Sequence, residues 1–162
     1  DGGLASPSEV PHHRGMRRAA VILGLVACGG SRDAGAPGKV ELFPAPPAGE
    51  VAPWVVERLA AARGRDVVVY VGATWCEPCG YFHRAVVDGQ LDAGFPRLTL
   101  LEFDADVDEA RLRAAGYTSQ MIPLFVRPGA DGRATDRTME GSIKGDGAVA
   151  ELTPRLRALL AK

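Results

Sequence analysis

Two cysteines separated by two residues follow directly on an apolar stretch of the chain. Residues 67–71, VVVYV, form a continuous apolar run, and Cys76 and Cys79 come just after it. A run of this kind is typical of a strand that is buried on both faces in a parallel sheet. The cysteine pair then lies where the chain leaves the strand and begins a helix. This arrangement indicates an α/β domain with thiols at a helix N-terminus.

The spacing of the cysteine pair restricts its chemistry. A c-type haem anchor requires histidine directly after the second cysteine, where this chain has Gly80. A structural zinc site needs about four nitrogen or sulfur ligands, and the domain has no second pair to complete one. A purely structural disulfide stays as an alternative, although it closes a tiny loop and constrains the unfolded chain little. Redox chemistry is therefore the favoured interpretation.

The position of each cysteine predicts its role. Cys76 opens the helix, where unpaired N–H groups and the helix dipole stabilise a thiolate, so we expect it to be the nucleophile. Cys79 lies one turn further on and is expected to resolve the mixed disulfide from the less exposed side. Pro78 suits the first helical turn. Trp75 is expected to cover the sulfur, with burial in the core as the alternative.

Composition excludes several classes of protein. The 162 residues are 46% hydrophobic and 24% charged, which suits one globular domain with a shorter extension. The net charge of -1 comes from acidic and basic residues in mixed order, so we expect no nucleic-acid partner. Three cysteines are too few for a small domain held together by disulfides.

The N-terminal part of the chain has the layout of a secretory signal. Residues 1–15 are polar and rich in Gly and Pro, and they are expected to be a disordered upstream segment. Residues 16–28 contain two arginines, an apolar run and small residues before Cys28. The sequence LVAC ending at Cys28 resembles the lipobox of bacterial lipoproteins, which implies lipidation of Cys28. The alternative is a short buried element with Cys28 as an ordinary core residue.

The rest of the chain is expected to be a tether followed by a globular domain. Residues 29–50 are rich in Gly and Pro and include a possible first strand at 40–43, and the domain is placed at 51–162. Apolar patterns and breaker residues predict the remaining elements, which are helices at 53–64, 79–91, 108–115 and 148–160 and strands at 67–71, 98–103, 124–127 and 135–140.

The motif WCEPC after a hydrophobic strand, together with Ile122-Pro123 before a later strand, resembles the thioredoxin superfamily over residues 51–162. The resemblance implies a three-layer α/β fold with a central mixed sheet flanked by helices. It implies a redox-active Cys76–Cys79 disulfide with no other cofactor and no metal, and proteins with disulfides or dithiols as partners. The substrate-binding residues implied are Trp75, Glu77, Pro78, Ile122, Pro123 and Gly141. The Ile122–Pro123 bond is expected to be cis, with a trans proline at a strand start as the alternative.

The chain departs from the family pattern near the cysteines. Tyr70 stands where the family usually has a buried aspartate, and Glu102 stands where a lysine commonly partners it. We expect Glu102 to accept the Cys79 proton through a water, with an ordinary solvent-facing carboxylate as the alternative. Gly80 replaces a frequent basic residue, and the Glu77 carboxylate opposes thiolate formation at Cys76.

These features together predict a lipid-anchored enzyme outside the cytoplasm. CEPC also occurs in membrane-tethered extracytoplasmic thioredoxin-like reductases, so a monomeric reductase on the periplasmic side of a bacterial membrane is expected. Its membrane contact would be the lipid on Cys28. One alternative is a thioredoxin-fold module that binds a partner without catalysis. The other is a disulfide oxidase or isomerase.

Overall fold

The computed structural model describes Gly2 and residues 38–161. The described elements follow the order expected from the sequence, with a strand-helix alternation that ends in a hairpin and a helix. They are β1 (Glu41–Pro44), α1 (Val51–Ala61), β2 (Asp66–Gly72), α2 (Glu77–Val87), β3 (Leu98–Asp104), α3 (Glu109–Ala114), β4 (Leu124–Pro128), β5 (Ala134–Glu140) and α4 (Ala148–Leu160).

The strands form one mixed five-stranded sheet in the order β1-β3-β2-β4-β5. β1 and β2 both pair with β3 in parallel, whereas β4 runs antiparallel to β2 and to β5. This confirms the mixed sheet and the hairpin. The domain boundary at residue 51 needs correction, because β1 is an edge strand of the sheet and lies within the segment that we assigned to the tether.

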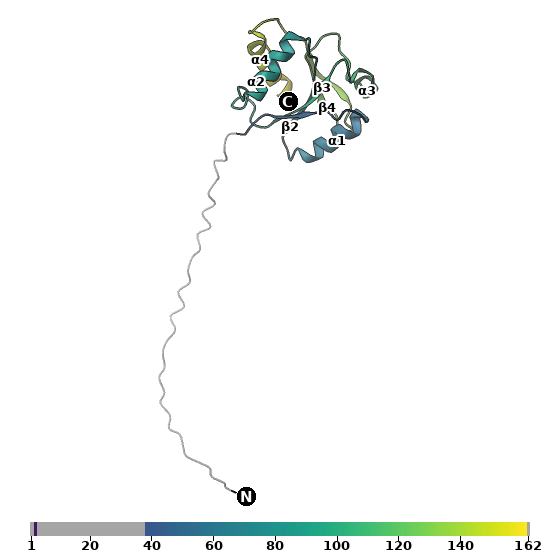
Figure 1. Ribbon diagram of the computed structural model, residues 1–162, viewed down its shortest axis with the longest axis vertical. Coiled ribbons are helices and arrows are strands. Elements are labelled where there is room, and N and C mark those ends of the chain that lie inside the picture. The colour runs from purple at the N-terminus through teal and green to yellow at the C-terminus, as the bar shows by residue number, and fades with distance from the viewer. Residues whose placement is uncertain (1, 3–37, 162) are drawn as a thin grey trace, which may run out of the picture. The chain divides into compact units, whose positions relative to one another are not determined.

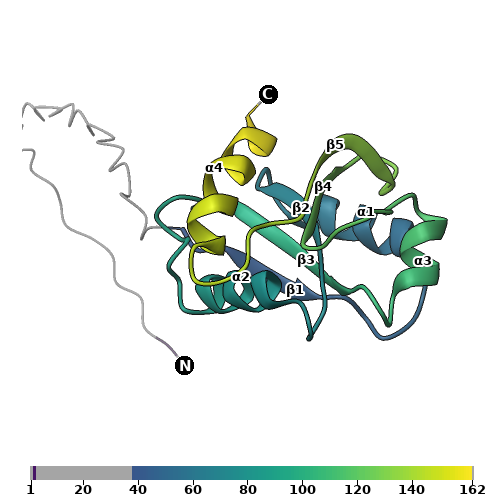
Figure 2. The same cartoon turned by 90° about the horizontal axis from the view of Figure 1, so that it is seen from above.

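Helices cover both faces of the sheet. Figure 1 shows α2 and α4 on one side and α1 with α3 on the other, and Figure 2 shows the same layers from above. The side chains of β2 explain this arrangement, because Val67, Val69 and Val71 pack with α1 and α3, whereas Val68 and Tyr70 pack with α2 and α4. The apolar run is therefore unbroken because both faces of β2 are buried.

Several helix boundaries differ from the expected ones, and two of the differences have a local cause. α1 begins at Val51, two residues before the position expected from Pro53, because a proline in the first turn removes no helical hydrogen bond. α2 ends at Val87 rather than near residue 91. The reason is Gly89, whose φ of 72° lies in the left-handed region and ends the helix.

Three aromatic rings join the sheet to α2. Tyr70 of β2, Phe82 of α2 and Phe125 of β4 have ring centroids 4.9 to 5.2 Å apart. Phe82 and Phe125 are fully buried, and only 1% of Tyr70 is exposed. The rings therefore hold the helix that carries the cysteines against the centre of the sheet.

We predict that Phe125→Ala lowers the free energy of unfolding by about 3 to 5 kcal/mol, because the cavity left among the rings cannot be refilled. Val87→Ala, at a position on α2 that is 65% exposed, should change it by less than about 0.5 kcal/mol. Denaturant unfolding of both variants measures the difference. Similar values for the two variants would show that the aromatic cluster does not hold α2 in place.

Candidate redox site

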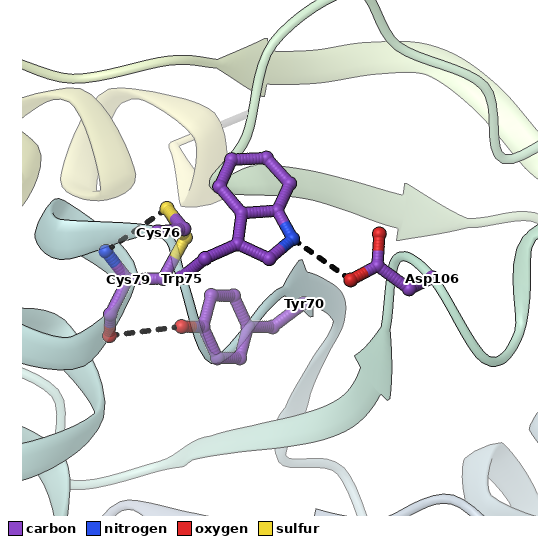
Figure 3. The surroundings of a disulfide bond; sticks show 5 residues. All are labelled: Tyr70, Trp75, Cys76, Cys79 and Asp106. Atoms are coloured by element: carbon purple, nitrogen blue, oxygen red, sulfur yellow. Dashed lines mark hydrogen bonds between the residues drawn. A yellow bond between two sulfur atoms is a disulfide. The ribbon is translucent and has the colours of Figure 1, made fainter.

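The two cysteines form a disulfide at the N-terminus of α2. Cys76 is the N-cap residue, and its sulfur accepts a hydrogen bond from the Cys79 backbone N–H at 3.3 Å. The sulfurs are bonded to each other, with the Cα atoms 5.2 Å apart (Figure 3). The predicted position of Cys76 at the positive end of a helix is therefore confirmed. An N–H donor and the helix dipole both stabilise a thiolate there.

Exposure alone does not distinguish the two cysteines. Cys76 is 5% exposed and Cys79 is 3% exposed, so Cys79 is the less exposed cysteine, as expected, but only by a small margin. The assignment of Cys76 as nucleophile rests instead on its place at the N-cap. Cys79 lies inside the first turn, and its carbonyl is held by Tyr70.

Trp75 is a surface residue. Its side chain points away from the disulfide, and the indole Nε1–H donates a hydrogen bond of 2.8 Å to the Asp106 carboxylate (Figure 3). Trp75 is 67% exposed, so the alternative that it belongs to the core is wrong. The bond to Asp106 holds the indole away from the disulfide, so the expectation that Trp75 covers the sulfur is not met.

A groove lies on the Trp75 side of the disulfide. It has a volume of about 550 Å³, and Trp75, Met121, Ile122 and Gly141 contribute to its lining. The Ile122–Pro123 peptide bond is cis, as the resemblance implied. The Gly141 N–H donates to the Pro123 carbonyl at 2.9 Å, which ties the loop to the end of β5.

Glycine is required at position 141 for two reasons. Its φ of 68° lies in the left-handed region. A Cβ atom there would also come within 3.3 Å of the Met121 side chain. The remaining residues expected to bind substrate lie around the groove rather than in its lining, since Pro123 and Pro78 are buried and Glu77 is exposed in the first turn of α2.

The other side of the disulfide has a different chemical character. The Tyr70 hydroxyl donates a hydrogen bond of 3.2 Å to the Cys79 carbonyl (Figure 3). Burial, and to a lesser extent the Glu102 carboxylate, raises the pKa of Tyr70 above its ordinary value. Tyr70 therefore keeps its proton and acts as a hydrogen-bond donor.

Glu102 lies on the same face of the sheet as α2. It pairs with Tyr70 in the register of β3 and β2, and laterally paired residues place their side chains on one face. Its Oε1 atom lies 2.6 Å from Nδ1 of His83 on α2, and its side chain is 23% exposed. The alternative of an unengaged, solvent-facing carboxylate is therefore wrong. Glu102 and Cys79 line a common cavity of about 570 Å³.

Sequence reasoning did not select His83 as a functional residue. The signal that could have identified it is its distance of four residues from Cys79, since residues so spaced lie on one face of a helix. Its partner Glu102 is 19 residues away in sequence, and only the packing of α2 on β3 brings the two together.

Two further observations concern only the described part of the chain. Residues 38–161 contain no group of three or more His, Cys, Asp or Glu side chains arranged to hold a metal ion. Within the same residues, no helix has the length and apolar character needed to cross a membrane. The predicted segments 1–15 and 16–28, with Cys28, lie outside the described residues apart from Gly2.

The structure is similar to those of thioredoxins. A thioredoxin h from poplar has a TM-score of 0.50 and 24% sequence identity, over 77% of this chain and 99% of the poplar chain. Thioredoxin O1 from Arabidopsis thaliana, in the oxidised state, has a TM-score of 0.48 and 15% identity, over 75% of this chain and 99% of its own. No protein-family model and no curated protein matches the chain. The match to the poplar protein shows a common fold.

We predict that Tyr70→Phe changes how stability depends on alkaline pH. The folded state holds the Tyr70 proton more tightly than the unfolded chain does, so this contribution is complete below about pH 10 and is lost as the pH rises further. Tyr70→Phe should be less stable by about 1 kcal/mol near neutral pH, because a buried hydrogen bond is removed. Its loss of stability above about pH 10 should be shallower. Denaturant unfolding at a series of pH values tests this, and parallel curves for both proteins would contradict it.

Proposed function

We propose that this chain, which has the thioredoxin fold, is a thiol-disulfide oxidoreductase that reduces disulfides in partner proteins. The observation that supports this most is the Cys76–Cys79 disulfide, which lies at the N-terminus of α2 beside a groove with exposed apolar side chains. Trp75 and Met121, 67% and 57% exposed, offer a partner protein apolar contacts near the sulfur.

The reaction proceeds by two exchanges. The reduced Cys76 thiolate attacks one sulfur of the substrate disulfide, forms a mixed disulfide and displaces the other substrate sulfur as a thiolate. Cys79 then attacks Cys76, which closes the Cys76–Cys79 bond and releases the second substrate thiolate. Two electrons pass from the protein dithiol to the substrate, and the released thiolates take up protons.

The proposal includes Glu102 as the group expected to accept the Cys79 proton. Its carboxylate lies on the Cys79 side of the sheet and lines the same cavity as Cys79. The groove on the other side would accept the substrate backbone along the loop from Met121 to Pro123. Gly141 would leave room for it there.

Reduction is proposed as the direction of electron flow, with oxidation or isomerisation as the alternatives. The Glu77 carboxylate lies in the first turn of α2, next to Cys76, where its charge opposes the thiolate form. A more stable thiolate makes a stronger oxidant, so this charge favours a reductant. The reduction potential of the Cys76–Cys79 pair distinguishes these directions.

The alternative function outside enzymes is a module that binds a partner protein without catalysis. Both cysteines, the exposed tryptophan and the cis Ile122–Pro123 bond are all present in one site, which favours catalysis over binding alone. The rate of insulin reduction by a thiol reductant, measured with and without the protein, distinguishes an enzyme from a binding module. A binding module would not accelerate it.

We further propose that the enzyme is a monomer held on the periplasmic side of a bacterial membrane by lipid on Cys28. Sequence alone supports this. Arg17 and Arg18, an apolar run and the LVAC sequence precede a Gly/Pro-rich stretch that could serve as a tether.

The cysteine variants should differ in what they accumulate. Cys76→Ser should abolish insulin reduction, because the attacking thiolate is gone. Cys79→Ser should instead retain substrate proteins as mixed disulfides on Cys76, because the second exchange cannot occur. Non-reducing electrophoresis before and after a thiol reductant measures this. Trapping by Cys76→Ser and not by Cys79→Ser would reverse the assigned roles.

The anchor proposal predicts a mature protein that begins at Cys28. Its mass should include the added acyl chains, and it should partition into the detergent phase, because more than one acyl chain gives stable membrane attachment. For the protein expressed in a bacterium, mass spectrometry measures the first property and detergent phase separation measures the second. Cys28→Ser should stay in the aqueous phase with an unmodified mass. A wild-type protein cleaved elsewhere would rule out this anchor.

A further inference from the structure

A histidine and a carboxylate form a pair beside the resolving cysteine. His83 Nδ1 lies 2.6 Å from Glu102 Oε1, with side chains 44% and 23% exposed. The pair connects α2 to β3. Because Cys79 and His83 are four residues apart on α2, their Cβ atoms are about 5 to 6 Å apart on one helix face.

The contact with an ionised carboxylate determines which ring nitrogen of His83 carries the hydrogen. An ionised carboxylate only accepts hydrogen bonds, so Nδ1 carries the hydrogen and donates it to Glu102. In a neutral ring, Nε2 is then free to accept a proton. A carboxylate on the opposite nitrogen both orients the ring and stabilises the imidazolium that forms, as in catalytic triads.

The cavity next to the pair provides a route for the proton. It measures about 570 Å³, and Cys79, His83 and Glu102 all line it, whereas Cys76 is not part of its lining. Polar groups on several sides and this volume are sufficient for ordered water molecules. A water between the Cys79 thiol and the imidazole is therefore consistent with the geometry.

The other ionisable groups of this cavity are less suited to accept the proton. Tyr70 on β2 donates its hydroxyl to the Cys79 carbonyl. Asp108 is paired with Arg111 at 2.7 Å, and Asp104 accepts the backbone N–H groups of the next turn. Arg84, on α2 itself, is a cation whose guanidinium lies over the Tyr81 ring.

We infer that His83 accepts the Cys79 proton through a water molecule in the second exchange, and that Glu102 positions His83 for this transfer. This inference rests on the proposed function and revises the role expected for Glu102 from proton acceptor to positioning residue. The Cys79 S–H bond breaks and an Nε2–H bond forms. The Cys79 thiolate then attacks Cys76 and displaces the substrate thiolate. His83 afterwards returns the proton to solvent or to the released thiolate.

The two exchanges can be followed separately with a symmetrical aromatic disulfide whose thiolate product is coloured. After rapid mixing with the reduced protein, the attack of Cys76 releases one coloured thiolate and the attack of Cys79 releases the second. Cys79→Ser should show only the first release, which assigns the phases. Insulin reduction by the wild-type protein tests the proposed function independently.

We expect His83→Gln to slow the second release by about 10²-fold near neutral pH, the lower end of the range for general base catalysis, and to leave the first unchanged. The difference from the wild-type rate should disappear above about pH 8.5, where a thiol ionises without a base.

Glu102→Gln should slow the second release less than His83→Gln does. Arg84→Gln, at the next position on the helix, serves as the matched control. Its second release at neutral pH should be as fast as that of the wild-type protein.

Contrary results are equally specific. An unchanged second release in His83→Gln, or a deficit that persists at alkaline pH, would overturn the role of His83. A larger effect of Glu102→Gln than of His83→Gln would make Glu102 the acceptor. If insulin reduction is absent in the wild-type protein, the proposed function fails, whereas an active enzyme with an unaffected His83→Gln variant refutes this inference alone.

Discussion

The burial of β2 at the centre of the sheet is the constraint on which the rest of the site depends. β2 pairs with β3 on one side and β4 on the other, and its side chains are covered on both faces. Its end at Gly72 therefore has a set position, and the cysteines follow a few residues later at the start of α2. The packing of Phe82 against Tyr70 and Phe125 then holds that helix in place.

The same packing gives the disulfide two unlike sides. The groove side has exposed apolar groups, which suit contact with a partner protein, and a glycine at position 141. The opposite side has a tyrosine, a histidine and a carboxylate around a cavity reached by Cys79. In the proposed mechanism, Cys76 exchanges sulfurs with the substrate on the groove side, and the Cys79 thiol loses its proton on the cavity side.

Tyr70 stands where the family that the sequence resembles usually has a buried aspartate, and this difference changes how charge is distributed near Cys79. An aspartate inside the core would place a charge far from water, whereas the Glu102 carboxylate is partly exposed and is already paired with His83. The tyrosine retains a hydrogen bond to the Cys79 backbone and fills the space with an aromatic ring. The chain thereby keeps an ionisable group beside Cys79 without burying an isolated charge.

Much of the fold and part of the site could be predicted because they depend on local sequence. The apolar run at 67–71, the proline and glycine signals and the spacing of Cys76 and Cys79 act within a few residues, so the order of elements and the N-cap position of Cys76 were predicted correctly. The mixed sheet was implied by the family resemblance and is also present. The boundary at residue 51 was wrong because the pairing of β1 with β3 depends on residues more than 50 positions apart. The exposure of Trp75 and the contact between His83 and Glu102 were decided only by tertiary structure. Alternation along a strand shows which residues share a face, but the helix that covers this face is known only once the sheet and helices have packed.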